Sequence, residues 1–402
     1  MRVRQGRANP SVTKKRLESM KSMADLERSV AGNMPPEPVG FRWYLHSSLP
    51  VSWLAKEVIP AIRYLRYTEY VPVVNLRRGW LHGTHLEIIA HTDDGRQVPW
   101  THVLARMSAP DEETAFVHTE EGYIERAREL GRLEQKSGPY LPLHPHGTFE
   151  WLANSDLKPW PGVAQTLRER ALTKMADSIA VTLEPGEDRA PLGDFVPLVT
   201  VAEIMLATAD AHPARIPYGV FSFRSHAEAF LNWSLAVADP RPEFERRLAA
   251  DRPVLRPLVK RMLDGADTRN SASWRRTASY CMGLFDSAVL AGSLTPETLD
   301  EINGRPGGAL PENMGPPGAP DAKPNPSEFH RIVDSSGIND RLPGWFTSYR
   351  LLLNLLYAQL PLLGVSLRQR YYLCWAIAET LDEVTGESWR DRLARRVSGG
   401  QK

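Results

Sequence analysis

Cysteine is scarce in this chain, and its scarcity excludes two kinds of site. Only Cys281 and Cys374 occur among the 402 residues, too few for a disulfide framework or a cysteine-based zinc site. No apolar run approaches the roughly 18 residues that a transmembrane helix needs, and the basic N-terminus lacks the apolar stretch of a secretory signal. The sequence therefore predicts a soluble, cytoplasmic protein.

The chain also lacks an excess of charge of either sign. It has 49 Lys and Arg against 48 Asp and Glu, a formal net charge of +1, which argues against a nucleic-acid protein that binds through a broad basic face. A Walker loop and the motifs GxGxxG, GxSxG, HExxH and CxxC are all missing, and each absence removes a class of enzyme. We therefore expect no cofactor, no metal, and neither a nucleic-acid nor a membrane partner.

Proline and glycine are plentiful, and they help to divide the chain. Residues 304–327 hold five Gly and seven Pro among 24 positions, so we predict a long mobile loop there. Residues 1–38 are predicted to be a basic, disordered tail, since six basic residues fall in the first sixteen with no acid among them. This tail is either a solvated extension or an arm that holds an acidic peptide or a partner. Residues 39–390 are predicted to form one domain, and residues 391–402 a second tail.

Ordered structure is predicted to begin with a β-α-β-β unit. Apolar and polar residues alternate from Phe41 to His46 with the period of a half-buried strand. The elements expected next are a helix at 52–66 that Pro60 kinks, strands at 71–76 and 84–91 joined by a tight turn at 77–80, and a largely helical stretch at 112–183 broken by a loop at 137–147.

From about residue 197 onward the pattern is helical. The expected helices are 198–211, 225–238, 242–263, 271–291, 296–301, 345–360 and one that begins after Ser366 and ends near Gly386. Ser366 and Gln369 have the spacing of a capping box at the start of that last helix. The fold class is therefore expected to be α+β, with a small N-terminal sheet portion and a largely helical C-terminal half.

The helix expected at 345–360 is the first candidate for a functional site. It is apolar nearly all round, so it should be buried, yet Arg350, Asn354 and Tyr357 stand at i, i+4 and i+7 on one face. A buried arginine needs a carboxylate, carbonyl groups or a ligand. Two interpretations are equally open: a structural ion pair between Arg350 and Asp286, or a polar stripe that lines a pocket.

The strand expected at 84–91 is the second candidate. His85, Glu87 and His91 share one face of it, while mostly apolar residues occupy the other. A histidine and a carboxylate two residues apart on a strand face suit proton transfer, and the alternative is an exposed sheet face without chemistry. His82 and His85 suggest a metal, but no third or fourth ligand has convincing spacing.

Both ends of the chain resemble known families. The segments FRWYLH at 41–46 and GTHLEI at 83–88 resemble the start of the elimination domain of LanB-type lantibiotic dehydratases. The segments WFTSYRLLLN at 345–354 and RYYL at 370–373, with Phe329-His330 before them, are similar to the close of stand-alone thiopeptide biosynthesis proteins. The resemblance extends over residues 40–390 and implies a fold like the LanB elimination domain.

Departures from the LanB pattern matter more than the matches. Glutamate-eliminating members carry His-Leu-Arg-Leu-Arg on the first strand pair, with arginines that engage the glutamyl ester. Here His85 matches, but Glu87 and Ile89 occupy the arginine positions. A histidine that eliminating members carry in the C-terminal helix is also missing, since Tyr349-Arg350 stands there instead. A site that expels a glutamate anion needs its cations, so the resemblance implies a different reaction.

Pyridine synthases of thiopeptide maturation use the same scaffold with divergent residues. The resemblance implies a cofactor-independent aza-[4+2] cycloaddition of two dehydroalanines in a modified precursor peptide, with loss of water and of the leader peptide. Such a reaction depends on positioning and on hydroxyl or amide proton donors. The residues expected to be catalytic are Ser348, Tyr349, Arg350, Asn354 and Tyr357. Those expected to bind substrate or leader are Arg77, Arg78, His85 and Glu87.

Two alternatives accompany this interpretation. One is a split glutamate-elimination lyase that forms dehydroalanine from glutamylated Ser or Thr. The other is a non-catalytic protein that binds the leader peptide and holds other enzymes. The expected partner in every case is the modified precursor peptide, with other biosynthetic enzymes or a second copy of the chain as further candidates.

Overall fold

The fold is seen in a computed structural model that describes residues 34, 36–46, 49–108, 119–134, 136, 138–157, 160–184, 193, 195–235, 238–303, 326–337 and 343–399. Nearly all of the predicted N-terminal tail lies outside the described residues. So does the predicted loop at 304–327, apart from its last two positions.

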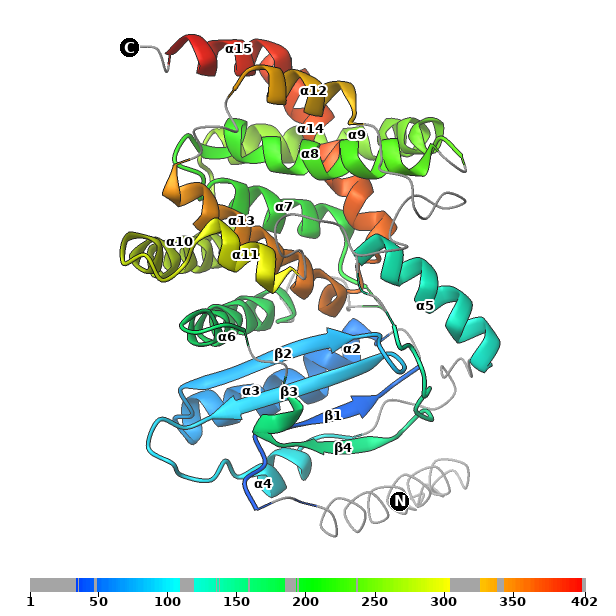
Figure 1. The fold of residues 1–402 in the computed structure, drawn as a ribbon, viewed down its shortest axis with the longest axis vertical. Helices are drawn as coiled ribbons and strands as arrows, with labels where there is room; N and C mark the ends of the chain where they lie inside the picture. Colours follow the sequence, from blue (N-terminus) through cyan, green and yellow to red (C-terminus); the bar gives the residue numbers. More distant parts are fainter. Residues whose placement is uncertain are drawn as a thin grey trace, which may run out of the picture.

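A small antiparallel sheet forms one end of the molecule (Figure 1). Its strands are β1 (Gly40–Tyr44), β2 (Val73–Gly79), β3 (His85–His91) and β4 (Phe149–Leu152), in the order β2-β3-β1-β4. The first three strands confirm the predicted β-α-β-β opening. The turn predicted at 77–80 is displaced, because β2 continues to Gly79 and the chain reverses at 80–83, where Gly83 has φ of +115°.

β4 was not predicted, because residues 112–183 were expected to be helical apart from one loop. Four residues are too short to show a strand period, and β4 exists because it pairs with β1, with Gly40 opposite Leu152. Elsewhere in this stretch the helix prediction is confirmed by α5 (Glu120–Glu134) and α6 (Ala164–Thr182).

One face of the sheet is apolar and packs on the helical segment that joins β1 to β2. This segment runs through α2 (Val51–Trp53), a π-helical turn (Leu54–Val58), α3 (Ile59–Arg63) and a second π-helical turn (Tyr64–Thr68). Pro60 lies in the first turn of α3, and its missing N–H leaves the preceding turn free to widen. Trp53 packs edge-on against Trp43 of β1, with ring centroids 5.9 Å apart, and the short helix α4 (Trp100–Leu104) covers the same face through Trp100 and Phe41.

The larger part of the molecule is a stack of helices beyond the β2 edge of the sheet (Figure 1). The helices are α7 (Leu198–Ala209), α8 (Arg215–Ser234), α9 (Arg241–Leu263), α10 (Arg269–Leu290), α11 (Pro296–Ile302), α12 (Glu328–Ser335), α13 (Gly344–Gln359), α14 (Leu367–Thr385) and α15 (Trp389–Gly399). Most agree with the prediction to within two residues, and the Ser366–Gln369 capping box opens α14 as expected.

α8 begins ten residues before its predicted start at 225. Pro217 and Gly219 argue against a helix in the sequence, but Pro217 falls in the first turn of α8, where no N–H is required. Gly219 packs against α7 so closely that a Cβ atom there would lie 2.1 Å from the carbonyl oxygen of Ala209. The glycine is therefore a packing requirement and not a helix end.

The edge strand β2 joins the two parts of the molecule. Its backbone N–H at Val74 donates to Thr173 Oγ1 of α6 at 3.2 Å, and its carbonyl at Leu76 accepts from Gln359 Nε2 of α13 at 3.2 Å. Helical side chains thus satisfy an edge that would otherwise be open to another strand. One apolar core continues from Phe41 in the sheet to Leu381 in α14.

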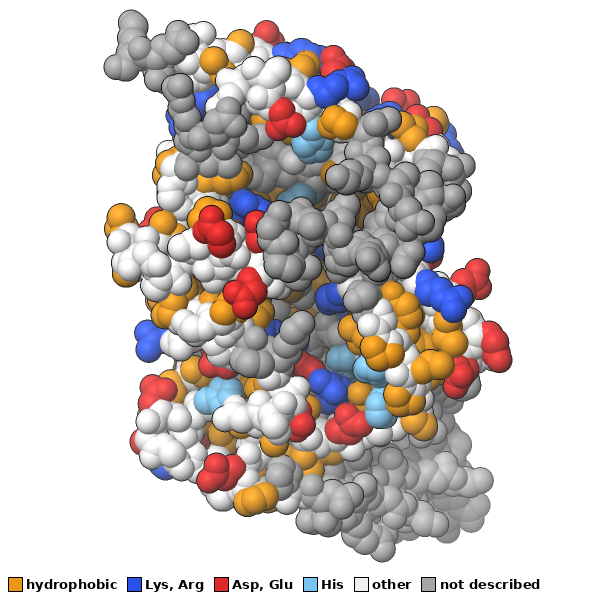
Figure 2. Space-filling model, in the orientation of Figure 1, with side chains coloured by type: hydrophobic (Ala, Val, Ile, Leu, Met, Phe, Trp, Pro, Cys, Tyr) orange, Lys and Arg blue, Asp and Glu red, His pale blue; other side chains and the backbone are white. Residues whose placement is uncertain are grey.

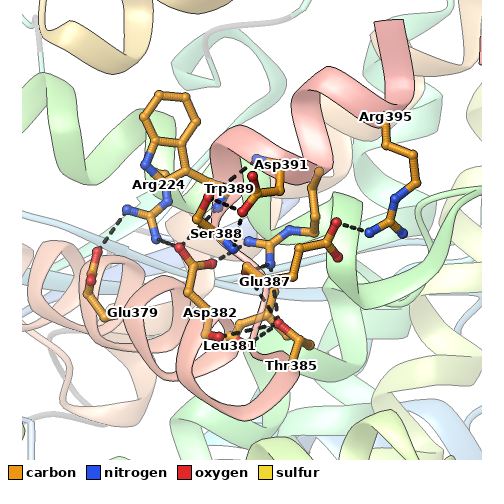
Figure 3. Close-up of polar contacts among 11 residues, drawn as sticks. Arg224, Glu379, Leu381, Asp382, Thr385, Glu387, Ser388, Trp389, Asp391 and Arg395 are labelled. Carbon is orange, nitrogen blue, oxygen red and sulfur yellow. Dashed lines mark hydrogen bonds and ion pairs between the residues drawn. The ribbon is translucent and has the colours of Figure 1, made fainter. Parts of the chain in front are cut away.

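α15 occupies most of the segment that was expected to be a C-terminal tail, and an ion-pair network fixes it (Figure 3). Arg224 of α8 donates to Glu379 at 2.8 Å and to Asp382 of α14 at 2.9 Å. The other oxygen of Asp382 pairs with Arg392 of α15, whose side chain is 2% exposed. Because Asp382 lies between two buried guanidinium groups, α15 is part of the folded domain.

Candidate active site

A cavity of about 1030 Å³ lies where the sheet meets the helices. Its walls come from the β2–β3 turn, α5, α8, α13 and the start of α14, with Ser327 and His330 at one side. In Figure 2, His and Lys/Arg side chains gather on this face of the molecule, at the level between the sheet and the helical stack. The cavity collects segments that are hundreds of residues apart in the chain.

Tyr357 and His226 form a hydrogen-bonded pair in the cavity wall. The Tyr357 hydroxyl of α13 lies 2.9 Å from Nδ1 of His226 on α8 and 3.5 Å from Sγ of Cys374 on α14. Burial, reinforced by Cys374, raises the pKa of the Tyr357 phenol well above its usual value. The hydroxyl therefore stays protonated and is held within hydrogen-bond distance of the imidazole.

Arg370 places a positive charge beside this pair. Its guanidinium carbon lies 5.0 Å from the centroid of the Tyr357 ring and 4.8 Å from that of Tyr371. A guanidinium stacked on aromatic rings stays charged while its edge remains available for hydrogen bonds. It can therefore stabilise negative charge that develops on a bound carbonyl or amide.

A second polar chain lies in the wall beside His226. His330 Nε2 is 3.0 Å from Ser225 Oγ, and His330 Nδ1 is 2.9 Å from Ser327 Oγ, the residue that caps α12. Burial lowers the pKa of His330, so the ring is neutral and accepts from one hydroxyl while it donates to the other. Asn354, one turn before Tyr357, donates through Nδ2 to Asn303 Oδ1 at 3.2 Å, which adds an amide pair.

The predicted polar stripe on α13 is only partly at the cavity. Asn354 and Tyr357 line it, whereas Arg350 is absent from the described lining. The stripe does share one face, but seven residues span about 10 Å along a helix, which carries Arg350 beyond the cavity. The expectation of a buried Arg350 is wrong, since it is partly exposed, and no ion pair with Asp286 occurs among the described contacts.

Tyr349 and Ser348 lie in the core and outside the described cavity lining. Both are fully buried. The Tyr349 hydroxyl donates to the Gly219 carbonyl at 3.1 Å, which satisfies it structurally, and burial raises its pKa far above the usual range. Their catalytic roles stay predictions.

The predicted leader-binding set divides between two places. Arg78 lines the cavity and donates to the Pro361 carbonyl at 3.0 Å. Arg77, His85 and Glu87 lie on the polar face of the sheet, where Glu87 stands between Arg42 of β1 and Arg77 of β2. Arg42 donates to Glu87 through Nε at 2.9 Å and Nη2 at 2.6 Å.

His85 is held as a neutral ring on this polar face. Its Nδ1 lies 2.8 Å from the Gly83 carbonyl, and burial lowers its pKa to about 4. Within the described ranges, no three His, Cys, Asp or Glu side chains are grouped so that they could hold a metal ion. Across the same part of the chain, no helix combines the length and the apolar character needed to cross a membrane.

Sequence patterns point only weakly to the histidines at this site. Ser225 and His226 fall near the start of a predicted helix, where a cap is the simplest role for Ser225, and His330 appears only as part of the thiopeptide-like ending. No spacing relates residue 226 to residues 330 or 357. Only the packing of α8 against α12 and α13 brings them together.

This fold, with a four-stranded sheet at one end and a stack of helices beyond it, is shared with two solved structures. The chain is similar to the pyridine synthase TbtD from thiomuracin biosynthesis, with a TM-score of 0.58 and 22% identity over 86% of this chain and 98% of that one. It is also similar to the crystal structure of TsrL, with a TM-score of 0.51 and 17% identity over 90% of this chain and 98% of that one. No protein-family model and no curated protein sequence matches the chain. The resemblance to thiopeptide pyridine synthases is thus confirmed at the level of the fold.

Proposed function

We propose that this chain is a pyridine synthase of thiopeptide biosynthesis that acts on a modified precursor peptide. The fold supports this role, and one observation carries it: a hydrogen-bonded phenol–imidazole pair, Tyr357 and His226, lines a large cavity beside the stacked guanidinium of Arg370. Groups of this kind suit a reaction that needs positioning and proton transfer.

The reaction joins two dehydroalanines of one peptide. The first, with the preceding amide as its iminol tautomer, is the diene, and the alkene of the second is the dienophile. Two C–C bonds form and close a six-membered ring that contains the amide nitrogen. Loss of the iminol oxygen as water, followed by loss of the leader peptide as its carboxamide, leaves an aromatic pyridine within a macrocycle.

The cavity supplies what this reaction lacks in solution. A volume of about 1030 Å³ is at the upper end of the range for ligand sites, about 300–1000 Å³, and it suits two distant peptide segments held together. Holding them converts an improbable encounter into a local one, which can remove about 7–11 kcal/mol from the barrier.

The polar groups then have distinct tasks in the proposed mechanism. Tyr357 and His226 exchange the proton that makes the iminol and return one to the departing water. Asn354 and its partner Asn303 hold a substrate amide, and Arg370 stabilises negative charge on the reacting carbonyl. His330, with its two serine partners, is a second proton carrier within the same wall.

The glutamate-elimination alternative has less support. The strand positions that carry arginines in eliminating members hold Glu87 and Ile89, and Glu87 already neutralises Arg42. An anionic glutamyl group would meet a carboxylate there. The non-catalytic alternative does not account for the buried phenol–imidazole pair in the cavity wall.

One experiment separates the three functions. Purified full-length protein is incubated with a linear precursor that bears thiazoles and dehydroalanines, and separately with a glutamylated precursor, and the products are read by mass spectrometry. We expect a macrocycle and intact leader carboxamide from the first substrate. Glutamate loss from the second substrate alone would establish the lyase, and leader binding without any product would establish the scaffold.

A further inference from the structure

Four arginine side chains line the cavity, and three of them have no carboxylate partner among the described residues. These three are Arg78 of β2 and Arg126 and Arg132 of α5, whereas Arg370 of α14 interacts electrostatically with Glu134. The one acidic side chain in the described lining, Glu134, is already engaged, since it accepts from Trp80 Nε1 at 2.8 Å and lies 3.1 Å from Lys136 Nζ. The cavity therefore carries a strong local excess of positive charge in a chain whose total is nearly neutral.

This excess contrasts with the buried arginines elsewhere in the fold. Arg224 has two carboxylate partners, and Arg392 has one, as expected, because a buried charge without a partner is costly. Within the described ranges, the one hydrogen-bond partner of Arg78 is the Pro361 carbonyl. Burial, together with the nearby charge of Arg126, lowers the pKa of Arg78 to about 10. A bound anion would offset both the cost of burying the Arg78 charge and its repulsion by Arg126.

α5 adds an apolar surface to the same wall. Ala127, Leu130 and Leu133 line the cavity together with Arg126, so this face of the amphipathic helix meets the cavity and not the main core. The Tyr123 hydroxyl anchors the helix to the β2–β3 turn through the Gly83 N–H at 3.2 Å and the Trp80 carbonyl at 3.1 Å. The wall thus offers guanidinium groups and apolar side chains on one fixed helix.

We infer that Arg78, Arg126 and Arg132 bind carboxylate side chains of an acidic, partly apolar segment of the peptide substrate, which lies along α5. Arg370 remains beside Tyr357 and serves the reaction. The identity of this ligand as the substrate rests on the proposed function, whereas the affinity for an acidic peptide does not. Guanidinium groups favour carboxylates because two parallel N–H donors match two oxygens.

The test is a binding measurement on the full chain. Two short peptides with an uncharged dye, one of repeated Glu-Leu-Ser and one of repeated Gln-Leu-Ser, are titrated with the protein and followed by fluorescence anisotropy. We expect the Glu peptide to bind about tenfold more tightly, with an advantage that shrinks between about 50 and about 300 mM salt as the charges are screened.

Matched substitutions locate the site. Arg126→Gln and Arg132→Gln should each weaken the Glu peptide about threefold and leave the Gln peptide unchanged. Arg128→Gln removes the same charge from an exposed position of α5 outside the described cavity lining, and it should have no effect. Thermal unfolding of each variant confirms that α5 still folds.

Two results would overturn the inference: equal affinity for the Glu and Gln peptides, or an equal loss of affinity in Arg126→Gln and Arg128→Gln. The outcome is independent of the proposed function, because no turnover is measured. Acidic-peptide binding without cyclisation of the precursor would contradict the function alone, and cyclisation without selective acidic-peptide binding would contradict this inference alone.

Discussion

Two buried tyrosines on α13 offer a direct test of which side chain does the chemistry. Tyr349 and Tyr357 each hold their hydroxyl in one close hydrogen bond, Tyr349 to the Gly219 carbonyl at 3.1 Å and Tyr357 to His226 at 2.9 Å. The sequence favoured both as catalytic residues. The structure brings only Tyr357 to the cavity, so replacing each with phenylalanine separates catalysis from packing.

The expected effects on stability are similar, and those on turnover are not. Loss of the Tyr349 hydroxyl removes one hydrogen bond, and loss of the Tyr357 hydroxyl removes one close hydrogen bond and a weak contact with Cys374 Sγ. Each variant should therefore lose about 1 kcal/mol of unfolding free energy. Tyr357→Phe also removes the proton partner of His226, and we expect turnover to fall about 10²- to 10⁴-fold, which is about 3–5 kcal/mol on the activation barrier. Tyr349→Phe should keep turnover within about twofold of wild type.

The assay is a time course of leader carboxamide release by mass spectrometry, with leader-peptide affinity measured on the same preparations. Affinity should survive in both variants, since neither hydroxyl is expected to hold the leader. Wild-type turnover in Tyr357→Phe would refute the assignment of the phenol–imidazole pair. Loss of turnover in a well-folded Tyr349→Phe would show that the core position reaches the reaction after all.

Three further predictions concern the scaffold. Asp382→Asn should lower the free energy of unfolding by about 3 kcal/mol, because Arg224 and Arg392 would lose a shared buried carboxylate; an unchanged urea midpoint would show that α15 is held by apolar contacts alone. Gly219→Ala should lower the free energy of unfolding by about 2 kcal/mol, since the added Cβ atom would collide with the Ala209 carbonyl. Wild-type stability of this variant would mean that α7 and α8 move apart freely. His212 lies between α7 and α8 and packs edge-on against Tyr349 of α13, with ring centroids 5.4 Å apart. Burial lowers its pKa from 6.5 to about 4, so the unfolded chain binds the proton first and stability should fall as the pH drops from 6.5 toward 4. A melting temperature that is constant over this window, or a decline that His212→Asn leaves unaltered, would contradict that assignment.

The sequence by itself determined the elements whose signals are local. The alternation in 41–46 and 84–91 specified β1 and β3, because side chains on a strand must alternate between the core and the polar face. Ser366 and Gln369 placed the start of α14 to the residue, and Gly386, with φ of +65°, marks its end. These devices act within a few residues, so no knowledge of the rest of the fold is needed to read them.

Tertiary structure decided the features whose causes lie far apart in the chain. β4 is a strand because β1 offers it a partner, and α15 is a helix of the domain because Asp382 fixes Arg392. Arg350 and Tyr357 share a helix face, yet only the second reaches the cavity, since the extent of its walls depends on where α5 and α8 pack. The pairing of His226 with Tyr357 has no trace in sequence spacing, because a hydrogen bond across 131 residues exists only once the helices that carry its partners have packed.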